Sequence, residues 1–233
     1  NGITDNRGLA KGKILPFKNR EKLVFDGGWG SMRAGYLVVN AHKDHENKTM
    51  DITGKVATNR FVSAIFKIRD FVFSRMDADG LYPLHFEHHV REGRHRDRGW
   101  TLFDHKRGSV FSDDDKGKAS KASPFTHNYM SLIYYLRTMD LAPGDTFSIN
   151  CFVHDKDYPI HFKVHGREKV KVDAGTFECL KLEPTLVGEG RSFSKGDKMY
   201  IWITDDNRRM PVMLESEMGL GSLSAKLVYY ESE

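Results

Sequence analysis

The chain has 233 residues, 39% of them hydrophobic and 12% aromatic, which is enough to bury a core of its own. Its 36 lysines and arginines exceed its 32 aspartates and glutamates by only four, and its mean hydropathy is -0.54. So even a mixture of charges does not predict a nucleic-acid-binding surface. The sequence contains no apolar run of about eighteen residues, so we expect no membrane-spanning helix.

Glycines and a proline are scattered among charges in the first twenty residues. We therefore expect residues 1–20 to form a poorly ordered leader and residues 21–233 to form a single domain. The sequence starts at Asn1, with neither a methionine nor an apolar segment. A removed export signal would leave such a start, and so would a recombinant product, so this feature alone does not predict a compartment.

Alternation with a period of two follows this leader. Residues 34–39 are apolar at nearly every position, which indicates a strand with two apolar faces. Residues 49–58 alternate apolar and polar side chains, and residues 70–76 do the same through Phe71 and Phe73. This pattern is typical of half-buried strands.

Between these strands lies a stretch whose apolar residues have helical spacing. Phe61, Ile65 and Ile68 are separated by four and three residues, which predicts a helix over residues 59–68 with one apolar face. Asn59 is a suitable N-cap for that helix.

A charged hairpin is predicted next. Residues 84–91 form its first strand, residues 93–98 a charged turn, and residues 100–105 its second strand. The first strand carries polar side chains along one face: His85, Glu87, His89 and Arg91.

Residues 112–124 are polar and predict a loop. Residues 126–139 have the clearest helical pattern in the chain, with Thr126 as its N-cap and Pro143 and Gly144 beyond its end. The apolar stripe of this helix consists of Tyr129, Leu132, Ile133, Leu136 and Met139.

The second half of the chain reads as a series of strands separated by short turns. We expect strands at 146–153, 160–172, 176–183, 198–204, 210–217 and 222–230. About ten strands and two helices, without alternation of strand and helix, predict a mainly β protein with an antiparallel meander sheet.

The two cysteines, Cys151 and Cys179, each lie in an apolar stretch. Two buried free thiols are the favoured interpretation, because an unpaired cysteine behaves as a small hydrophobic residue. A disulfide is the alternative, and it would require the two residues to lie on neighbouring strands.

The histidines do not predict a metal site. His85 and His89 lie on one face of a strand but about 13 Å apart, too far to bind one ion together. His88 points to the opposite face, and the histidine-rich stretch 42–46 lacks a second pair of ligands. We therefore expect no metal and no other cofactor.

Catalytic and nucleic-acid-binding patterns are equally weak. Glu92 and Asp97 interrupt the arginines of the hairpin, so we expect no nucleic-acid partner. The sequence contains no Gly-x-Ser-x-Gly motif and no phosphate-binding glycine loop, and its cysteines lie within strands. Whether the protein is an enzyme stays open, with a non-enzymatic role favoured and no catalytic residue proposed.

Several phrases occur together in an order that is specific as a set. They are GYLVV, RFVSAIFKIRDFVFSRMD, LYPLHFEHHVREG, YMSLIYYLRTMDLAPGD, HFKVHGREKVKVDAGTFECLKLEP and IWITDDNRRMPVMLESEMGLGSLSAKL. Over approximately residues 21–230 the chain resembles the bacterial exported proteins of domain-of-unknown-function family 3108. The resemblance implies a removed signal, a periplasmic or other cell-envelope location, and a strongly curved antiparallel sheet, either a half-barrel or an open barrel.

The resemblance brings no catalytic residues. Eight positions of this sequence resemble the residue pattern of the family. Each of them also fits a structural role, in a turn, at the exit of a helix or at the end of a strand. They are Arg137, Gly144, Gly166, Glu168, Gly175, Trp202, Asp206 and Pro211.

Two functional hypotheses follow. In the first, the curved sheet of a non-enzymatic envelope protein binds an apolar or amphipathic ligand, such as a lipid, or a protein partner, such as a lipoprotein. Its expected lining residues are aromatic: Phe71, Phe73, Trp100, Phe103 and Trp202.

In the second hypothesis, the protein binds or processes an envelope polysaccharide. The polar strip of His85, Glu87, His89 and Arg91 would then contact the sugar, and Trp100 would stack on it.

Overall fold

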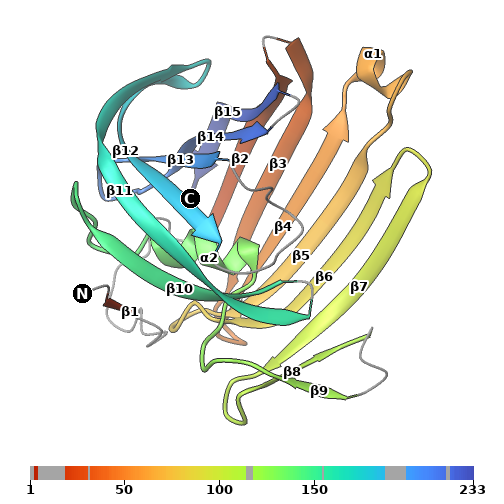
Figure 1. The fold of residues 1–233 in the computed structure, drawn as a ribbon, viewed down its shortest axis with the longest axis vertical. Coiled ribbons are helices and arrows are strands. Elements are labelled where there is room, and N and C mark those ends of the chain that lie inside the picture. Colours follow the sequence, from red (N-terminus) through yellow and green to blue (C-terminus); the bar gives the residue numbers. More distant parts are fainter. Residues whose placement is uncertain are drawn as a thin grey trace.

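The structure, a computed structural model, describes residues 3–4, 19–30, 32–113, 118–153, 155–186, 198–218 and 221–233 (Figure 1). Its helices are α1 (Arg60–Ser63) and α2 (Tyr129–Leu136). Its strands are β1 (Ile3–Thr4), β2 (Arg20–Trp29), β3 (Met32–Asp44), β4 (Thr49–Thr58), β5 (Arg69–Asp77), β6 (Pro83–Glu92), β7 (His95–Asp104), β8 (Ser109–Ser112), β9 (Ala119–Lys121), β10 (Thr146–Val153), β11 (Lys156–Val172), β12 (Gly175–Leu186), β13 (Lys198–Thr204), β14 (Pro211–Met218) and β15 (Gly221–Ser232).

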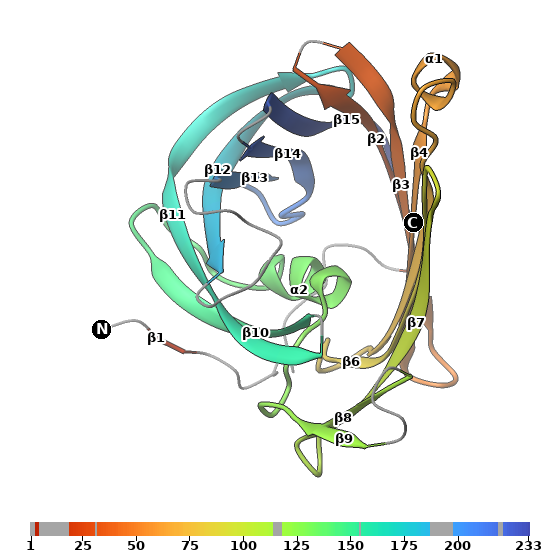
Figure 2. The ribbon, with the colours of Figure 1, turned by 45° about the vertical axis from the view of Figure 1, so that its right-hand side comes forward.

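All described strands belong to one strongly curved sheet. From β2 to β9 and from β10 to β15 each strand pairs antiparallel with the next along the chain, while β1 pairs parallel with β10. The last strand, β15, pairs antiparallel with β2, so the C-terminal strand lies inside the sheet rather than at its edge. Among the described strands the sheet does not close, because β9 pairs there only with β8, and β10 pairs with β11 and β1 (Figure 2). The predicted curved antiparallel meander is thus confirmed.

The concave side of the sheet is filled by α2 (Figure 2). Leu132, Tyr135 and Leu136 of this helix are buried in one hydrophobic core with side chains from both halves of the sheet, among them Met50 of β4 and Leu182 of β12. The helix α2, which lies in the connection between β9 and β10, therefore supplies side chains that pack with those of the sheet to form this core.

The helix α2 is shorter than the predicted span 126–139. Asn128 is its N-cap, accepting hydrogen bonds from the backbone N–H groups of Met130 and Ser131. Thr126, the predicted cap, instead donates its hydroxyl to Asp157 at 2.6 Å. Because its hydroxyl bonds to a side chain distant in sequence, Thr126 does not cap α2.

A buried ion pair holds the end of α2 against β2. Both terminal nitrogens of Arg137 donate to the Glu21 carboxylate at 2.6 Å, and the Tyr134 hydroxyl donates to it at 3.0 Å. Only 1% of the Arg137 side chain and 4% of the Glu21 side chain are exposed. Burial would lower the pKa of Arg137, but the charge and hydrogen bonds of Glu21 outweigh it and raise that pKa.

The helix α1 is a single turn rather than the predicted helix over residues 59–68. Asn59 is its N-cap as predicted, and its side chain accepts from the Val62 N–H at 2.9 Å. The predicted apolar face does not pack on the sheet, because Phe61 is 86% exposed and Ile65 is 92% exposed.

The predicted charged turn at 93–98 is also shorter in the structure. β7 begins at His95, so Arg96 and Arg98 belong to a strand. Within the predicted loop 112–124, residues 119–121 form β9 and pair with β8, whereas residues 114–117 lie outside the described part.

The long β11–β12 hairpin reaches β15 and β2 and encloses a second core. Val170 packs there with Leu23 and Leu227, and the Ala174 N–H donates to the Leu227 carbonyl at 3.2 Å.

Both cysteines are free and buried, but in different cores: Cys151 lies with α2 and Cys179 in the second core. The alternative of a disulfide is therefore wrong. Burial raises the pKa of both thiols, that of Cys179 to about 12.

The predicted leader, residues 1–20, falls largely outside the described residues, because positions 1–2 and 5–18 do so. Of the remainder, Ile3–Thr4 forms β1 and Arg20 begins β2. The leader and the single domain stay predictions.

Candidate functional site

The two faces of the sheet from β2 to β7 differ in what covers them. Side chains at alternating positions, such as Met50 and Ile52 of β4 and Met76 of β5, face α2 and are fully buried. The intervening positions, such as Phe71 and Phe73 of β5, therefore lie on the opposite, convex face. We call this convex side of β2–β7 the outer face.

The five predicted aromatic residues do not line one cavity. Phe71, Phe73 and Trp100 lie on the outer face, where 39% of Trp100 is exposed. Phe103 and Trp202 are only 7% and 3% exposed and belong to separate cores.

The indole of Trp202 has a structural partner. Its Nε1–H donates to the Glu168 carboxylate at 2.7 Å, and the Lys181 ammonium lies 5.0 Å from the centre of its ring. Glu168 belongs to β11 and Lys181 to β12, so these two contacts hold the Trp202 side chain of β13 against these two strands.

The predicted polar strip lies on the same outer face as three of the aromatic residues. His85, Glu87, His89 and Arg91 alternate along β6, between β5 and β7. In register, Glu87 lies between Phe73 and Trp100, and His89 lies between Phe71 and Arg98. Three of the five aromatic residues of the first predicted site therefore share one surface with the polar strip of the second.

Part of this face is hollowed. A groove of about 590 Å³ runs over β2–β6, and we call it the outer groove. It is lined by Lys22, Tyr36, Val38, Asn40, Lys55, Val56, Ala57, Arg69, Asp70, Phe71, His89 and Arg91.

The outer groove is positively charged. Lys22, Lys55, Arg69 and Arg91 line it, against the single carboxylate of Asp70. Asp70 accepts a hydrogen bond from the backbone N–H of Arg91 at 2.8 Å. Within the part of the chain that the structure describes, none of the four basic side chains forms an ion pair. Arg69 donates to the Ile68 carbonyl at 2.8 Å, but in the described residues no carboxylate neutralises the charge of these four side chains through an ion pair.

Aromatic rings lie beside these charges. The Lys55 ammonium is 5.9 Å from the centre of the Phe71 ring, and the rings of Phe71 and His89 are 6.1 Å apart. Tyr36, on the far side of the groove, is 45% exposed. Cations and rings in one open groove suit a molecule that carries both negative charge and apolar surface.

Sequence reasoning missed Lys22, Tyr36, Lys55 and Arg69. The only local signal was their place at the polar or outward positions of alternating strands, which any solvated strand also shows. Their convergence depends on strand order and register, because Lys22 and Asn40 face each other across β2 and β3.

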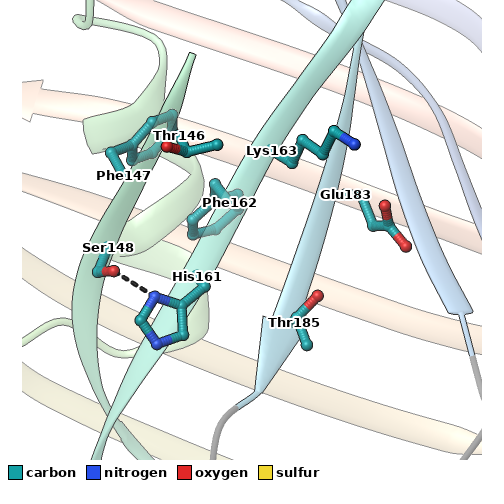
Figure 3. A pocket seen from close by; sticks show the side chains of 8 residues that line it. All are labelled: Thr146, Phe147, Ser148, His161, Phe162, Lys163, Glu183 and Thr185. Atoms are coloured by element: carbon teal, nitrogen blue, oxygen red, sulfur yellow. Dashed lines mark hydrogen bonds between the residues drawn. The ribbon is translucent and has the colours of Figure 1, made fainter. Parts of the chain in front are cut away.

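A second, smaller hollow of about 190 Å³ lies over β10–β12 (Figure 3). There Ser148 and His161 are hydrogen-bonded, with 2.5 Å between Oγ and Nδ1. A nucleophilic serine needs a histidine that a carboxylate orients. The nearby carboxylate, Glu183, instead bonds His165 at 2.6 Å. Among the described residues, this hollow therefore lacks the serine, histidine and carboxylate arrangement of a hydrolase.

Over the described residues, no three His, Cys, Asp or Glu side chains gather closely enough to hold a metal ion. In the same part of the chain, no helix combines the length and apolar character that crossing a membrane would require.

The fold and its outer groove define a class of protein: an open, β-barrel-like antiparallel sheet with its own helix on the concave side. A solved structure shares this architecture: a β-barrel-like protein of domain of unknown function DUF1849 from Brucella abortus. It is 12% identical, covers 93% of this chain and 99% of its own, and has a TM-score of 0.66. At that identity the likeness shows the fold alone.

The family described as protein of unknown function DUF3108 matches residues 24–228, and the chain belongs to it. The resemblance inferred from the sequence phrases is thereby confirmed. Among curated proteins, none matches this chain closely enough to count as a relative.

Two further solved structures have lower scores. One, from Parabacteroides distasonis, is provisionally described as a lipoprotein; it is 9% identical, covers 94% of this chain and 98% of its own, and has a TM-score of 0.40. Another, from Bacteroides fragilis, is provisionally described as an exported protein with a YmcC-like fold; it is 12% identical, covers 94% and 99%, and has a TM-score of 0.38. With these TM-scores, neither of the two structures supports an inference about the fold of this chain.

Proposed function

We propose that this protein is a non-enzymatic protein of the cell envelope that binds an amphipathic anion, such as an anionic lipid, in the outer groove. The observation that carries the proposal is the group of four basic side chains that lie beside exposed rings and form no ion pair with the residues that the structure describes. The envelope location is supported by the export that the resemblance of the sequence implies. The concave side is a poor alternative, because α2 is packed there.

Charge reversal in the outer groove tests this function. We expect Lys55→Glu with Arg91→Glu to weaken binding of a dansyl-labelled fatty acid at least about tenfold, which corresponds to about 1.4 kcal/mol. The reason is that each substitution replaces an attraction for the carboxylate with a repulsion. Fluorescence titration of the labelled fatty acid measures the change, and oleate and uncharged oleyl alcohol serve as competitors.

Lys171→Glu provides the matched control, because this exposed lysine lies on β11, away from the outer groove. It should leave the affinity unchanged, and oleate should compete much better than oleyl alcohol. The proposal fails if the wild-type protein does not bind the probe, or if the control and the double variant weaken binding equally.

Binding of a polysaccharide is a second candidate function, because Trp100 is exposed directly across from Glu87. An exposed indole beside a carboxylate is a suitable platform for a sugar ring. If a glycan array yields a ligand, we expect Trp100→Ala and Glu87→Ala each to weaken its binding about tenfold or more. A glycan whose affinity neither substitution changes would contradict this use of the outer face.

A further inference from the structure

Three segments lie together at one end of the sheet, around α1 (Figure 1). They are residues 29–30 with 32–33, residues 59–68, and the β6–β7 turn at residues 92–95, and we call this end the rim. The Asn59 side chain donates to the Arg33 carbonyl at 2.7 Å, which joins the first two segments. The Gly93 N–H donates to the Lys67 carbonyl at 2.8 Å, which joins the last two.

The rim exposes large apolar side chains. Phe61 is 86% exposed and Ile65 is 92% exposed, and α1 buries none of its residues. Trp29 and Met32, which flank the β2–β3 turn, are 53% and 58% exposed. A concentration of exposed large apolar residues at one end of a sheet indicates a surface that another apolar phase covers.

The rim holds these side chains in a defined arrangement. Gly93 adopts a positive φ of 55°, and a side chain there would lie 2.8 Å from the Phe66 ring. The absence of that side chain lets Phe66 pack against the β6–β7 turn. Phe61 and Ile65 therefore project from a segment that is fixed at both ends.

Basic residues outnumber acidic ones around the apolar side chains, where Glu92 of the β6–β7 turn is a nearby acidic residue. Arg60, Lys67, Arg69 and Arg94 are exposed, and no acidic residue occurs between positions 60 and 69. No ion pair involves any of these four in the part of the structure that is described. Protruding apolar side chains beside an excess of basic ones complement an anionic bilayer, whose headgroups are negative and whose interior is apolar.

The outer groove ends at the rim. Val56 and Ala57 lie near the end of β4, and Arg69 begins β5, so the groove residues lie immediately before and after the α1 segment. A molecule leaving a membrane at the rim would therefore be next to the groove.

We propose that the rim docks the protein on an anionic lipid surface, with Phe61 and Ile65 inserted between the headgroups. This site goes beyond the proposed binding of a free amphiphile, since it uses different side chains. The charges provide the preference for anionic lipid, and the two apolar side chains provide the insertion.

Co-sedimentation with vesicles tests the rim. We expect the wild-type protein to bind vesicles of phosphatidylcholine mixed with phosphatidylglycerol and to bind vesicles of phosphatidylcholine alone much more weakly. Phe61→Ser with Ile65→Ser should reduce the partition coefficient for the mixed vesicles at least about tenfold, because both apolar insertions are lost. Added salt should weaken wild-type binding, because it screens the basic side chains.

Leu102→Ser is the matched control, because Leu102 is 45% exposed on the outer face of β7, away from the rim. It should bind vesicles as the wild type does, and far-ultraviolet circular dichroism should show that all variants fold. The proposal is overturned if wild-type protein does not bind anionic vesicles. That result would be expected if the rim docks on another protein instead. It is equally overturned if the rim double variant binds as the wild type does. Fatty-acid binding in the groove should survive the rim substitutions, which separates the two proposals.

Discussion

Replacing Arg137 with methionine is expected to lower the free energy of unfolding by about 3–5 kcal/mol, because it leaves the Glu21 carboxylate buried without its opposite charge. The two side chains meet through two hydrogen bonds of 2.6 Å in a region that is almost inaccessible to water. Urea unfolding followed by circular dichroism measures the loss. The double variant Arg137→Met with Glu21→Met should lose less than the sum of the two single variants, because no charge then stays buried alone.

A more exposed arginine–carboxylate pair that also has two hydrogen bonds serves as the control. Arg75 donates two hydrogen bonds of 2.7 Å to Asp51, but 48% of the Arg75 side chain is exposed. Arg75→Met should therefore cost no more than about 1 kcal/mol. Equal losses for Arg75→Met and Arg137→Met would contradict the role given to burial.

Acid is expected to destabilise the protein through His127. This side chain is fully enclosed, and its Nδ1 lies 3.1 Å from the Ser131 hydroxyl. Burial lowers its pKa to about 3, whereas an unfolded histidine has a pKa near 6.5. Below about pH 6.5 the unfolded state therefore binds a proton that the folded state does not bind. The resulting stability is complete above that pH and is lost as the pH falls toward about 3.

The expected slope is about 1.4 kcal/mol per pH unit, or of the order of 3 kcal/mol between about pH 6.5 and about pH 4. Urea unfolding over this range measures it, with His127→Gln compared with the wild type to separate the histidine from the carboxylates. The free-energy gap between the two proteins should narrow as the pH falls. Burial also lowers the pKa of His105, which acts in the same direction and should persist in His127→Gln. A gap that stays constant with pH would contradict the inferred pKa of His127.

Local patterns predicted most of the strands. Thr49–Thr58 is a strand with the predicted boundaries, because its alternation reports directly which side chains face the core. The helix ends were predicted less well. Thr126 and Asn128 are both acceptable caps by residue type, and only the distant carboxylate of Asp157 decides that Thr126 is used elsewhere.

For the predicted sites too, the sequence identified individual residues, whereas their combination depends on the tertiary structure. The aromatic residues and the polar strip were identified by type, and the alternation along β6 correctly placed His85, Glu87, His89 and Arg91 on one face. Of these residues, Phe71, His89 and Arg91 line the outer groove, and their combination there with Lys22 and Lys55 depends on the pairing of separate strands. Phe61 and Ile65 have the spacing of a helix face that packs on a core, yet the chain leaves α1 after one turn and exposes both.

By itself, the sequence determined the class of the fold, a mainly β antiparallel meander, because strand periodicity and turn residues act between near neighbours. Tertiary structure alone decided the pairing of β15 with β2, the position of α2 inside the sheet, and the contact of Glu21 with Arg137. The strand pairing and the ion pair join residues more than a hundred positions apart, and the curving of the sheet around a core, rather than any local preference, selects all three arrangements. The outer groove and the rim are consequences of that curvature.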